Sequence, residues 1–452
     1  MLLETAWYNY HDETDSPKYV RLYFCIRREI ERGNIPSHYR LPSIRQISGE
    51  LGLSKTTVEN AYNQLNVEGY IYSIPQKGYF TSQMDKSFLY SAQSGRREKE
   101  GFVKTIRNPK YMDEELFDFH EWKKTYSRVL EGFCGRLLQE GNPQGETELR
   151  DALCVYAYRA RGIQCNPDQI VIGAGVQTLL HIICDITEEV VDKKVAFEEP
   201  GFTDVRYIFQ RRGFCLYPVE LEEDGINIQY LFDKKVSLCF ISPSHQYPTG
   251  LVMPIQKRME LLYWAAQVNG YIMEDDYDSE LRFSGRPVPS LFSLDNRDRV
   301  IYIGSFSTAL MPSLRISYMI LPDLLMKNYK KCNLNYRSTV SAAEQLTLAL
   351  FINGGHYEKH LRKMRKKCSE RLRAILREAE PYKGIFNVYS SDTGTFVLLE
   401  SNNGRITEII KNNGMKMGLG IRNIWGRYFV LQFGNIPENL MGKLMKEISY
   451  EK

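Results

Sequence analysis

Six short, almost wholly apolar segments recur between residues 169 and 322, and they limit the possible fold more than any other feature. They read QIVIGAG, KVAFEEP, VSLCFISP, GYIMEDDYD, RVIYIGS and RISYMILP, with stretches of helical periodicity between them. Strands that are apolar on both faces and alternate with helices are typical of a mainly parallel sheet covered by helices on both sides. We therefore predict an α/β domain over residues 119–452, whose later segments GTFVLLES and RYFVLQFG form a smaller C-terminal lobe.

Residues 17–82 show a different pattern, with three short amphipathic helices followed by a hairpin. We expect the first helix to bury one face, which carries Tyr19, Tyr23, Ile26 and Ile30. Two further helices should begin at serine N-caps and end at glycines, and two β-prone runs, 71–74 and 79–81, follow. Three helices, a tight LGLS turn and a hairpin together indicate a winged helix-turn-helix.

A winged helix-turn-helix would bind duplex DNA with its third helix in the major groove, its second helix near phosphates and its hairpin as the wing. The residues predicted to contact DNA are Arg40, Ser43, Arg45, Ser54, Lys55, Thr56, Thr57, Lys77 and Gly78. The competing interpretation is a dimerisation module on which these polar residues are merely exposed.

Positive charge gathers near the N-terminus, as expected if this end meets nucleic acid. Residues 17–82 hold nine Lys/Arg against five Asp/Glu, and residues 86–110 hold seven against two, whereas the whole chain of 452 residues has a net charge of only +4. The polar, weakly periodic stretch 83–118 is predicted to be an interdomain linker. Its charge could add nonspecific DNA contacts or belong to a solvated tether.

Composition and the N-terminal sequence indicate the cellular compartment and whether disulfides or metal sites are expected. No run of 18 apolar residues appears, and the N-terminus lacks the basic-then-apolar order of a signal peptide, so we expect a cytoplasmic protein without membrane spans. The nine cysteines form no CxxC or Cys/His cluster, which predicts reduced thiols and no metal site.

The segment IYIGSFSTALMPSLRISYMI, residues 301–320, has the residue types of a phosphate site. Gly304 would let the backbone approach a ligand, Ser305 and Ser307 can donate hydrogen bonds, and Arg315 can bind an anion through two nitrogens. The Gly-Ala-Gly that ends at Gly175 precedes a predicted helix, whose free N–H groups would also suit a phosphate.

This segment resembles the lysine segment of fold-type I aminotransferases, roughly G-[ST]-F-S-K-x-L-x-P-x-x-R-x-G-Y, with Thr308 where the family has the lysine that holds pyridoxal phosphate covalently. GNPQGETELRDAL, EEPGF, SPSHQYPTG and EDDYDSE extend the resemblance, and they imply an aromatic residue stacked on the pyridine ring and partners for the ring nitrogen and the phenolic oxygen. The cofactor-binding residues implied by the resemblance are Gly175, Val176, Gln177, Phe202, Tyr247, Asp275, Tyr277, Ser305, Ser307 and Arg315.

Residues 17–82 resemble the GntR family through LPS-x-R, LG-L-S-x-x-T-V, AY-x-x-L and EGY, so the whole chain is similar to MocR-type transcription regulators. That resemblance implies a head-to-tail, domain-swapped homodimer and a small-molecule effector such as an amino acid or a pyridoxal phosphate adduct. Thr308 leaves three options: reversible binding of pyridoxal phosphate or a preformed amino-acid adduct, a different anionic ligand, or an empty site. The resemblance implies no catalytic residue, and the family's carboxylate-binding arginine aligns with Val430. Two alternatives remain: a working pyridoxal phosphate-dependent aminotransferase with an accessory DNA-binding domain, and a large domain that is only a dimerisation scaffold.

Overall fold

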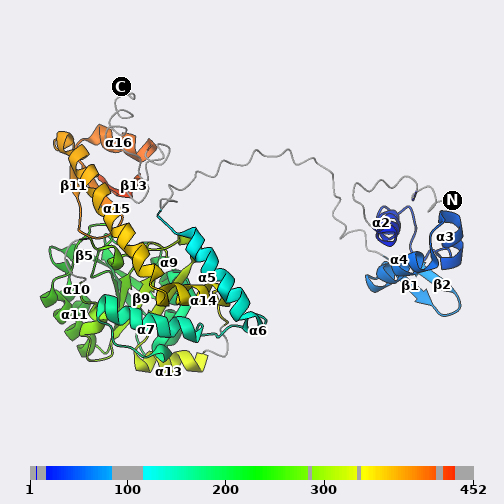
Figure 1. The fold of residues 1–452 in the computed structure, drawn as a ribbon, viewed down its shortest axis with the longest axis horizontal. Helices are drawn as coiled ribbons and strands as arrows, with labels where there is room; N and C mark the ends of the chain where they lie inside the picture. Colours follow the sequence, from blue (N-terminus) through cyan, green and yellow to red (C-terminus); the bar gives the residue numbers. More distant parts are fainter. Residues whose placement is uncertain are drawn as a thin grey trace. The chain divides into compact units, whose positions relative to one another are not determined.

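The computed structural model describes Trp7 and residues 17–83, 116–283, 288–332, 337–413 and 421–432, without the side chains of 409–413 and 421–425. The chain divides into two compact units, Met1–Val103 and Lys104–Lys452, shown in Figure 1 and described separately below. Residues 84–115 of the predicted linker lie outside the described residues.

The N-terminal unit contains the three predicted helices and the hairpin. The elements are α2 (Lys18–Glu31), α3 (Ile44–Leu51), α4 (Lys55–Val67), β1 (Ile71–Ile74) and β2 (Gly78–Thr81), and the two strands pair antiparallel. Ser43 Oγ accepts from the N–H of Gln46 at 3.2 Å, and Ser54 Oγ accepts from the N–H of Thr57 at 3.1 Å. Both predicted N-caps are thus confirmed, and each satisfies a backbone donor that the helix start would otherwise leave free.

One core prediction for this unit was wrong. The buried stripe of α2 runs through Leu22, Tyr23, Ile26 and Ile30, whereas Tyr19 is 39% exposed. Tyr19 lies in the first turn of α2, at the edge of the stripe that packs on α4. The amphipathic pattern therefore gave the correct face but extended it one turn too far.

An eight-stranded sheet forms the centre of the larger unit. Its strands are β3 (Ile170–Ala174), β4 (Lys194–Glu199), β5 (Cys215–Glu222), β6 (Gly225–Ile226), β7 (Leu238–Ile241), β8 (Tyr271–Asp276), β9 (Val300–Ser305) and β10 (Ile316–Ile320). Their order is β3-β10-β9-β8-β7-β4-β5-β6. The middle strands run parallel, while β10 is antiparallel to both β3 and β9, and β6 is antiparallel to β5. All six apolar segments are strands of this sheet, as predicted.

Helices cover both faces of this sheet (Figure 1). One core cluster joins Tyr302 and Tyr318 to Leu153 of α7 (Thr147–Arg161) and Leu348 of α14 (Ala342–Asn353). The cluster on the opposite face contains Met273 and residues of α8 (Val176–Thr187), α9 (Arg206–Arg211) and α13 (Asp323–Cys332). Further helices are α5 (Phe119–Gly132), α6 (Cys134–Leu137), α10 (Ile228–Asp233), α11 (Ile255–Gln267), α12 (Leu291–Leu294) and α15 (His356–Ala379).

The C-terminal lobe has a four-stranded antiparallel sheet, as the later short segments predicted. It contains β11 (Phe386–Tyr389), β12 (Phe396–Ser401), β13 (Ile421–Trp425) and β14 (Tyr428–Gln432), in the order β11-β12-β14-β13, together with α16 (Gly404–Asn413). Within the described ranges, no helix is long and apolar enough to cross a membrane, and no group of three or more His, Cys, Asp or Glu could hold a metal ion.

Candidate functional site

Three predicted ligand-binding residues meet because β10 runs against its neighbours. Its first residue, Ile316, is paired with Ala174 at the end of β3, and Ser317 is paired with Ser305 at the end of β9. The start of β10 therefore lies at the same edge of the sheet as the ends of β3 and β9. This arrangement brings Arg315, Gly175 and Ser305 to one place.

The start of α8 and the guanidinium of Arg315 form a cup whose groups would suit an anion. Gly175 has φ 85°, and a Cβ added to it would lie 2.3 Å from Nη2 of Arg315, so only glycine fits there. No side chain caps the start of α8, which leaves the N–H groups of Val176 and Gln177 for a ligand. A cation beside an uncapped helix N-terminus favours a phosphate or carboxylate.

The two predicted serines follow in the turn after β9. Ser305 is buried, and its Oγ accepts from the N–H of Ser307 and from the hydroxyl of Ser317, both at 3.2 Å. With both lone pairs engaged, the hydroxyl of Ser305 retains one proton to donate to an anion. Ser307 and Thr308 are half-buried in the same turn.

Gly304 has a structural role that the sequence did not predict. A Cβ at this position would lie 2.5 Å from the ring of Tyr318, its cross-strand partner on β10. The glycine therefore makes room for a tyrosine within the sheet, and close approach of a ligand is not needed to explain it.

Asp275 is a buried carboxyl group on the α8 face of β8. It is 7% exposed, and no described residue hydrogen-bonds to its side chain. Burial raises the pKa of Asp275 to about 8, with smaller contributions from Asp276, Asp278 and Glu198. A cationic ligand group would stabilise the ionised form of this carboxyl group.

Tyr277 belongs to a chain of polar groups that the sequence reasoning missed. Its hydroxyl donates to the carbonyl oxygen of His245 at 2.9 Å. The Nδ1 of His245 lies 2.8 Å from Oδ2 of Asp278, and its Nε2 lies 2.8 Å from Oγ of Ser391, which precedes β12. This chain ties the C-terminal lobe to the sheet. His245 and Asp278 stand inside SPSHQYPTG and EDDYDSE, which were the signal available, but nothing local pointed to Ser391.

Two of the predicted ligand-binding residues, Phe202 and Tyr247, are aromatic and contact each other. Phe202 is 40% exposed, and its ring lies perpendicular to that of Tyr247, with centroids 6.5 Å apart. Val430 is buried with Phe396 in an apolar cluster against Tyr247 and Tyr277. Nearby Arg427 forms an ion pair with Glu400 at 2.5 Å, while the side chain of Arg422 lies outside the described residues.

An open cleft of about 720 Å³ adjoins this aromatic region, between the sheet domain and the C-terminal lobe. Thr249 and Gly250 line one side, and Tyr389, Leu398 and Tyr428 line the other. Leu398 and Tyr428 also belong to the cluster that contains Tyr247 and Tyr277, so the cleft lies beside the aromatic region of the site.

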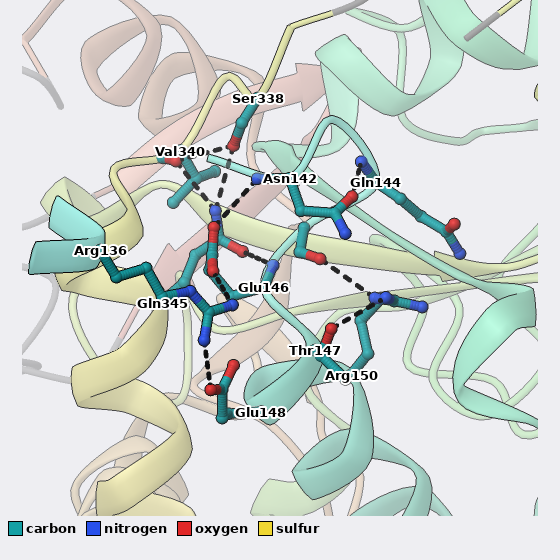
Figure 2. Close-up of polar contacts among 11 residues, drawn as sticks. Arg136, Asn142, Gln144, Glu146, Thr147, Glu148, Arg150, Ser338, Val340 and Gln345 are labelled. Carbon is teal, nitrogen blue, oxygen red and sulfur yellow. Dashed lines mark hydrogen bonds and ion pairs between the residues drawn. The ribbon is translucent and has the colours of Figure 1, made fainter. Parts of the chain in front are cut away.

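Residues of the GNPQGETELR motif form a network of polar contacts that includes Gln345 of α14 (Figure 2). Gln144 Nε2 donates to the carbonyl oxygen of Ile170 at 2.8 Å, and the N–H of Glu146 donates to Oε1 of Gln345 at 2.8 Å. Arg150 Nε donates to the carbonyl oxygen of Gly145 at 3.0 Å. These bonds fasten the loop to the start of β3, the strand that ends at the cup.

Of the lysines that the structure describes, only Lys257 is buried. Its ammonium is held by Glu222 at 2.6 Å and Asp224 at 3.0 Å. Among the described residues, the one buried lysine is therefore already engaged by two acidic side chains.

The predicted DNA-contacting residues lie on the surface of the N-terminal unit, with one exception. Thr57 is half-buried, and its hydroxyl lies 2.7 Å from that of Ser54, within the first turn of α4. Arg40 bridges to Phe80 of the hairpin, and its Nε lies 4.0 Å from where a Cβ of Gly78 would be. Exposed at the surface are Arg40, Ser43, Arg45, Ser54, Lys55, Thr56, Lys77 and Gly78.

A small unit of three helices and a hairpin joined to a large α/β unit is the architecture of a helix-turn-helix protein with an additional α/β domain. Residues 18–81 match the bacterial regulatory proteins of the gntR family, and residues 106–413 match aminotransferase class I and II. The chain belongs to the MocR/GntR-type helix-turn-helix transcription regulators, in which these two domains are fused.

Relatives and solved structures agree with this assignment. The HTH-type transcriptional regulator YdeL of Bacillus subtilis is 40% identical over 81% of this chain and 79% of its own length. The probable rhizopine catabolism regulatory protein MocR of Rhizobium meliloti is 31% identical, over 80% and 77%. The fold is similar to that of kynurenine aminotransferase from Pyrococcus horikoshii, with a TM-score of 0.66 and 23% identity over 81% of this chain and 97% of that one.

Proposed function

We propose that this cytoplasmic regulator binds duplex DNA through residues 17–82 and senses a small anionic molecule in the cup at Arg315, without catalysing transamination. The observation that carries the proposal is the combination of Thr308 with an intact cup. The guanidinium of Arg315, the open start of α8 and the Ser305 hydroxyl suit an anion. A threonine hydroxyl cannot supply the amine that amino-group transfer requires.

Pyridoxal phosphate or its amino-acid adduct fits this set of residues. Its phosphate would be held by the N–H groups of Val176 and Gln177, by Ser305 and Ser307, and by Arg315. Phe202 and Tyr247 would flank the ring, Asp275 would hold a protonated ring nitrogen, and the Tyr277 hydroxyl would meet the phenolic oxygen. When bound, this cofactor serves as an electron sink in amino-acid chemistry. The unpaired Asp275 carboxyl supports the fit, since a protonated ring nitrogen would stabilise its charge.

The proposal also includes the order of the domains and the assembly of two subunits. We infer a DNA-binding domain over 17–82, a linker over 83–118 and a ligand-binding domain over 119–452, assembled as a head-to-tail, domain-swapped homodimer. Phe117 is buried in the core of the larger unit, and Asp118 Oδ1 caps α5 by accepting from the N–H of Glu121 at 3.0 Å. The last residues of the linker are therefore packed against the ligand-binding domain.

The test is a titration of the full-length protein with pyridoxal phosphate, followed by absorbance and by calorimetry. We expect saturable, reversible binding that dialysis removes and that Arg315→Ala weakens by about tenfold or more, because the charged hydrogen bonds to the phosphate are lost. A matched Arg297→Ala change, at an exposed arginine outside the cup, should leave binding unchanged. Equal binding by wild type and Arg315→Ala would remove the cup from the proposal.

A second experiment tests the alternative that the protein is a working aminotransferase. Purified protein supplied with pyridoxal phosphate should not transfer amino groups between any amino acid and oxoacid pair, because Thr308 cannot carry the proton. Turnover that Asp275→Asn abolishes would establish the aminotransferase instead.

A further inference from the structure

A second cavity lies on the opposite face of the sheet from the cup. Successive residues of a strand point to opposite faces, so Asp275 faces the α8 side and Asp276 faces the α7 side. There, Nε of Arg161 lies 2.8 Å from Oδ2 of Asp276. Next to this pair, a cavity of about 590 Å³ opens between α7, the 3-10 helix η3 (Ser279–Leu281) and the start of α15.

Two polar groups in the wall of this cavity have no partner. Ser279 is only 7% exposed, and its Oγ makes no hydrogen bond to any described residue. Glu280 accepts a hydrogen bond from the Tyr156 hydroxyl on Oε1 at 3.2 Å, but its buried Oε2 accepts none from the described part of the chain. A buried hydroxyl and a buried carboxyl oxygen without partners are costly, and a bound donor would satisfy both.

The charges around Glu280 indicate what kind of donor this is. Burial, followed by the charge of Asp276, raises the pKa of Glu280 to about 8. The nearby cations are already engaged: Arg161 pairs with Asp276, and Arg365 donates to the backbone carbonyl of Glu280 at 2.7 Å and to Glu358 at 3.3 Å. Arg282, which also lines the cavity, has a partner as well, and no described cation hydrogen-bonds to the Glu280 carboxyl group, so a bound ammonium would meet no competing cation there.

Arg159 marks a second binding position further along α7. It lies three residues after Tyr156, hence on the same side of the helix and about 4.5 Å further along its axis. It is exposed, lines the cavity, and forms no ion pair with another described residue. The cavity lining also includes the apolar residues Ala152, Val155 and Ile352.

We propose that this cavity binds a small primary amine with an anionic group at its other end. The ammonium is held by the Glu280 carboxylate and the Ser279 hydroxyl, the anion by Arg159, and the connecting carbons lie against the apolar lining residues. An ammonium has three donors and can satisfy both unpartnered groups at once. This site goes beyond the proposed function and does not depend on pyridoxal phosphate.

The experiment is isothermal titration calorimetry of the full-length protein with three probes: 5-aminopentanoate, pentylamine and pentanoate. We expect 5-aminopentanoate to bind and each single-ended probe to bind at least about tenfold more weakly, since each lacks one charged hydrogen bond. Glu280→Gln should weaken 5-aminopentanoate binding by about tenfold or more. Arg159→Ala should weaken it to match pentylamine.

The Glu280→Gln variant should fold, because glutamine resembles the protonated acid and keeps an oxygen for the Tyr156 hydroxyl. Ser279→Ala provides a second, smaller change in the same wall, and Glu260→Gln, at an exposed residue of α11, is the control that should bind like wild type. Three results would overturn the proposal: no binding of 5-aminopentanoate at about 10 mM, a range typical of weak ligands, equal binding by wild type and Glu280→Gln, or loss of binding in Asp275→Asn with retention in Glu280→Gln. The last result would place the probe in the cup instead.

Discussion

At the scale of single residues, we predict that Thr308 determines whether the cup can bind pyridoxal phosphate covalently. Replacing Thr308 by lysine introduces an amine into the turn after β9, beside Ser307 and on the same segment as Arg315. If pyridoxal phosphate occupies the cup, this variant should bind it covalently, because an amine condenses with the cofactor's aldehyde. The measurement is the mass of the intact protein after borohydride reduction, together with a yellow colour before reduction.

A matched control distinguishes the amine from the longer side chain. Thr308→Met adds a long side chain without a nitrogen and should show no mass increase, as should the wild type. If Thr308→Lys also gains no mass in excess cofactor, the cup binds a different anion and the pyridoxal phosphate interpretation fails.

Asp275 should make the stability of the ligand-free protein depend on pH. Its pKa in the folded chain is about 8 against 3.8 for an ordinary Asp, so between these values the folded state holds more protons and its stability falls as pH rises. Asp275→Asn removes this cost, and the variant should gain about 1 to 4 kcal/mol over wild type at pH 8 but almost nothing at pH 4. Thermal unfolding at both pH values measures this difference.

The control for that experiment is Asp192→Asn, at an exposed aspartate, which should shift stability equally at the two pH values. A pH-independent difference between wild type and Asp275→Asn would mean that the carboxyl group is not buried in the ligand-free protein.

Residues that belong to a local sequence pattern could be predicted from the sequence. Arg315 is an example, because it follows a glycine and two serines within one short segment. The sequence did not predict Ser391 beside His245, since 146 residues separate them and only the packing of the C-terminal lobe brings them together. Ser279 and Glu280 were read only as part of EDDYDSE. Their lack of partners depends on α7 and α15, which no local pattern reveals.

At the scale of elements, the N-terminal turns of α3 and α4 should control DNA binding. Arg45 and Lys55 are exposed in these turns, next to the confirmed caps Ser43 and Ser54. Arg45→Ala and Lys55→Ala should each weaken binding and lower the slope of log affinity against log salt by about one, since one phosphate contact is lost. Changes at Thr56, which has no such charge, should alter sequence preference more than the salt slope.

Mobility shifts across a salt series measure both quantities, with Arg28→Ala on α2 as a control at an exposed cation. Because Arg28 lies outside the predicted interface, we expect the Arg28→Ala variant to bind DNA with nearly the affinity of the wild type. DNA binding that survives deletion of residues 1–82 would contradict the assignment.

The elements themselves were more predictable than their directions. Apolar runs identified β3, β4, β7, β8, β9 and β10, because a doubly covered strand needs apolar residues on both faces. The run that became β10 gave no sign of its antiparallel direction, which follows from the short connection back from β9. That direction is what places Arg315 at the cup.

At the scale of the whole molecule, the structure suggests where the predicted homodimer would form. Leu138, just after α6, is 90% exposed, which is unusual for a large apolar side chain. Phe119 and Leu130 of the adjoining α5 are 56% and 48% exposed. An apolar surface of this kind is typical of a subunit interface.

We therefore expect sedimentation of the full-length protein at micromolar concentration to give a mass about twice 52.6 kDa. Leu138→Glu should shift this equilibrium toward monomer, because a buried, unpaired carboxylate opposes association. Ile255→Glu is the matched control: Ile255 is 57% exposed on α11, which Figure 1 shows away from α6 within the same unit. Dimeric Leu138→Glu together with monomeric Ile255→Glu would move the interface to α11. A wild-type protein that is monomeric yet binds DNA normally would rule out the dimer, since paired reader domains are expected to bind paired half-sites.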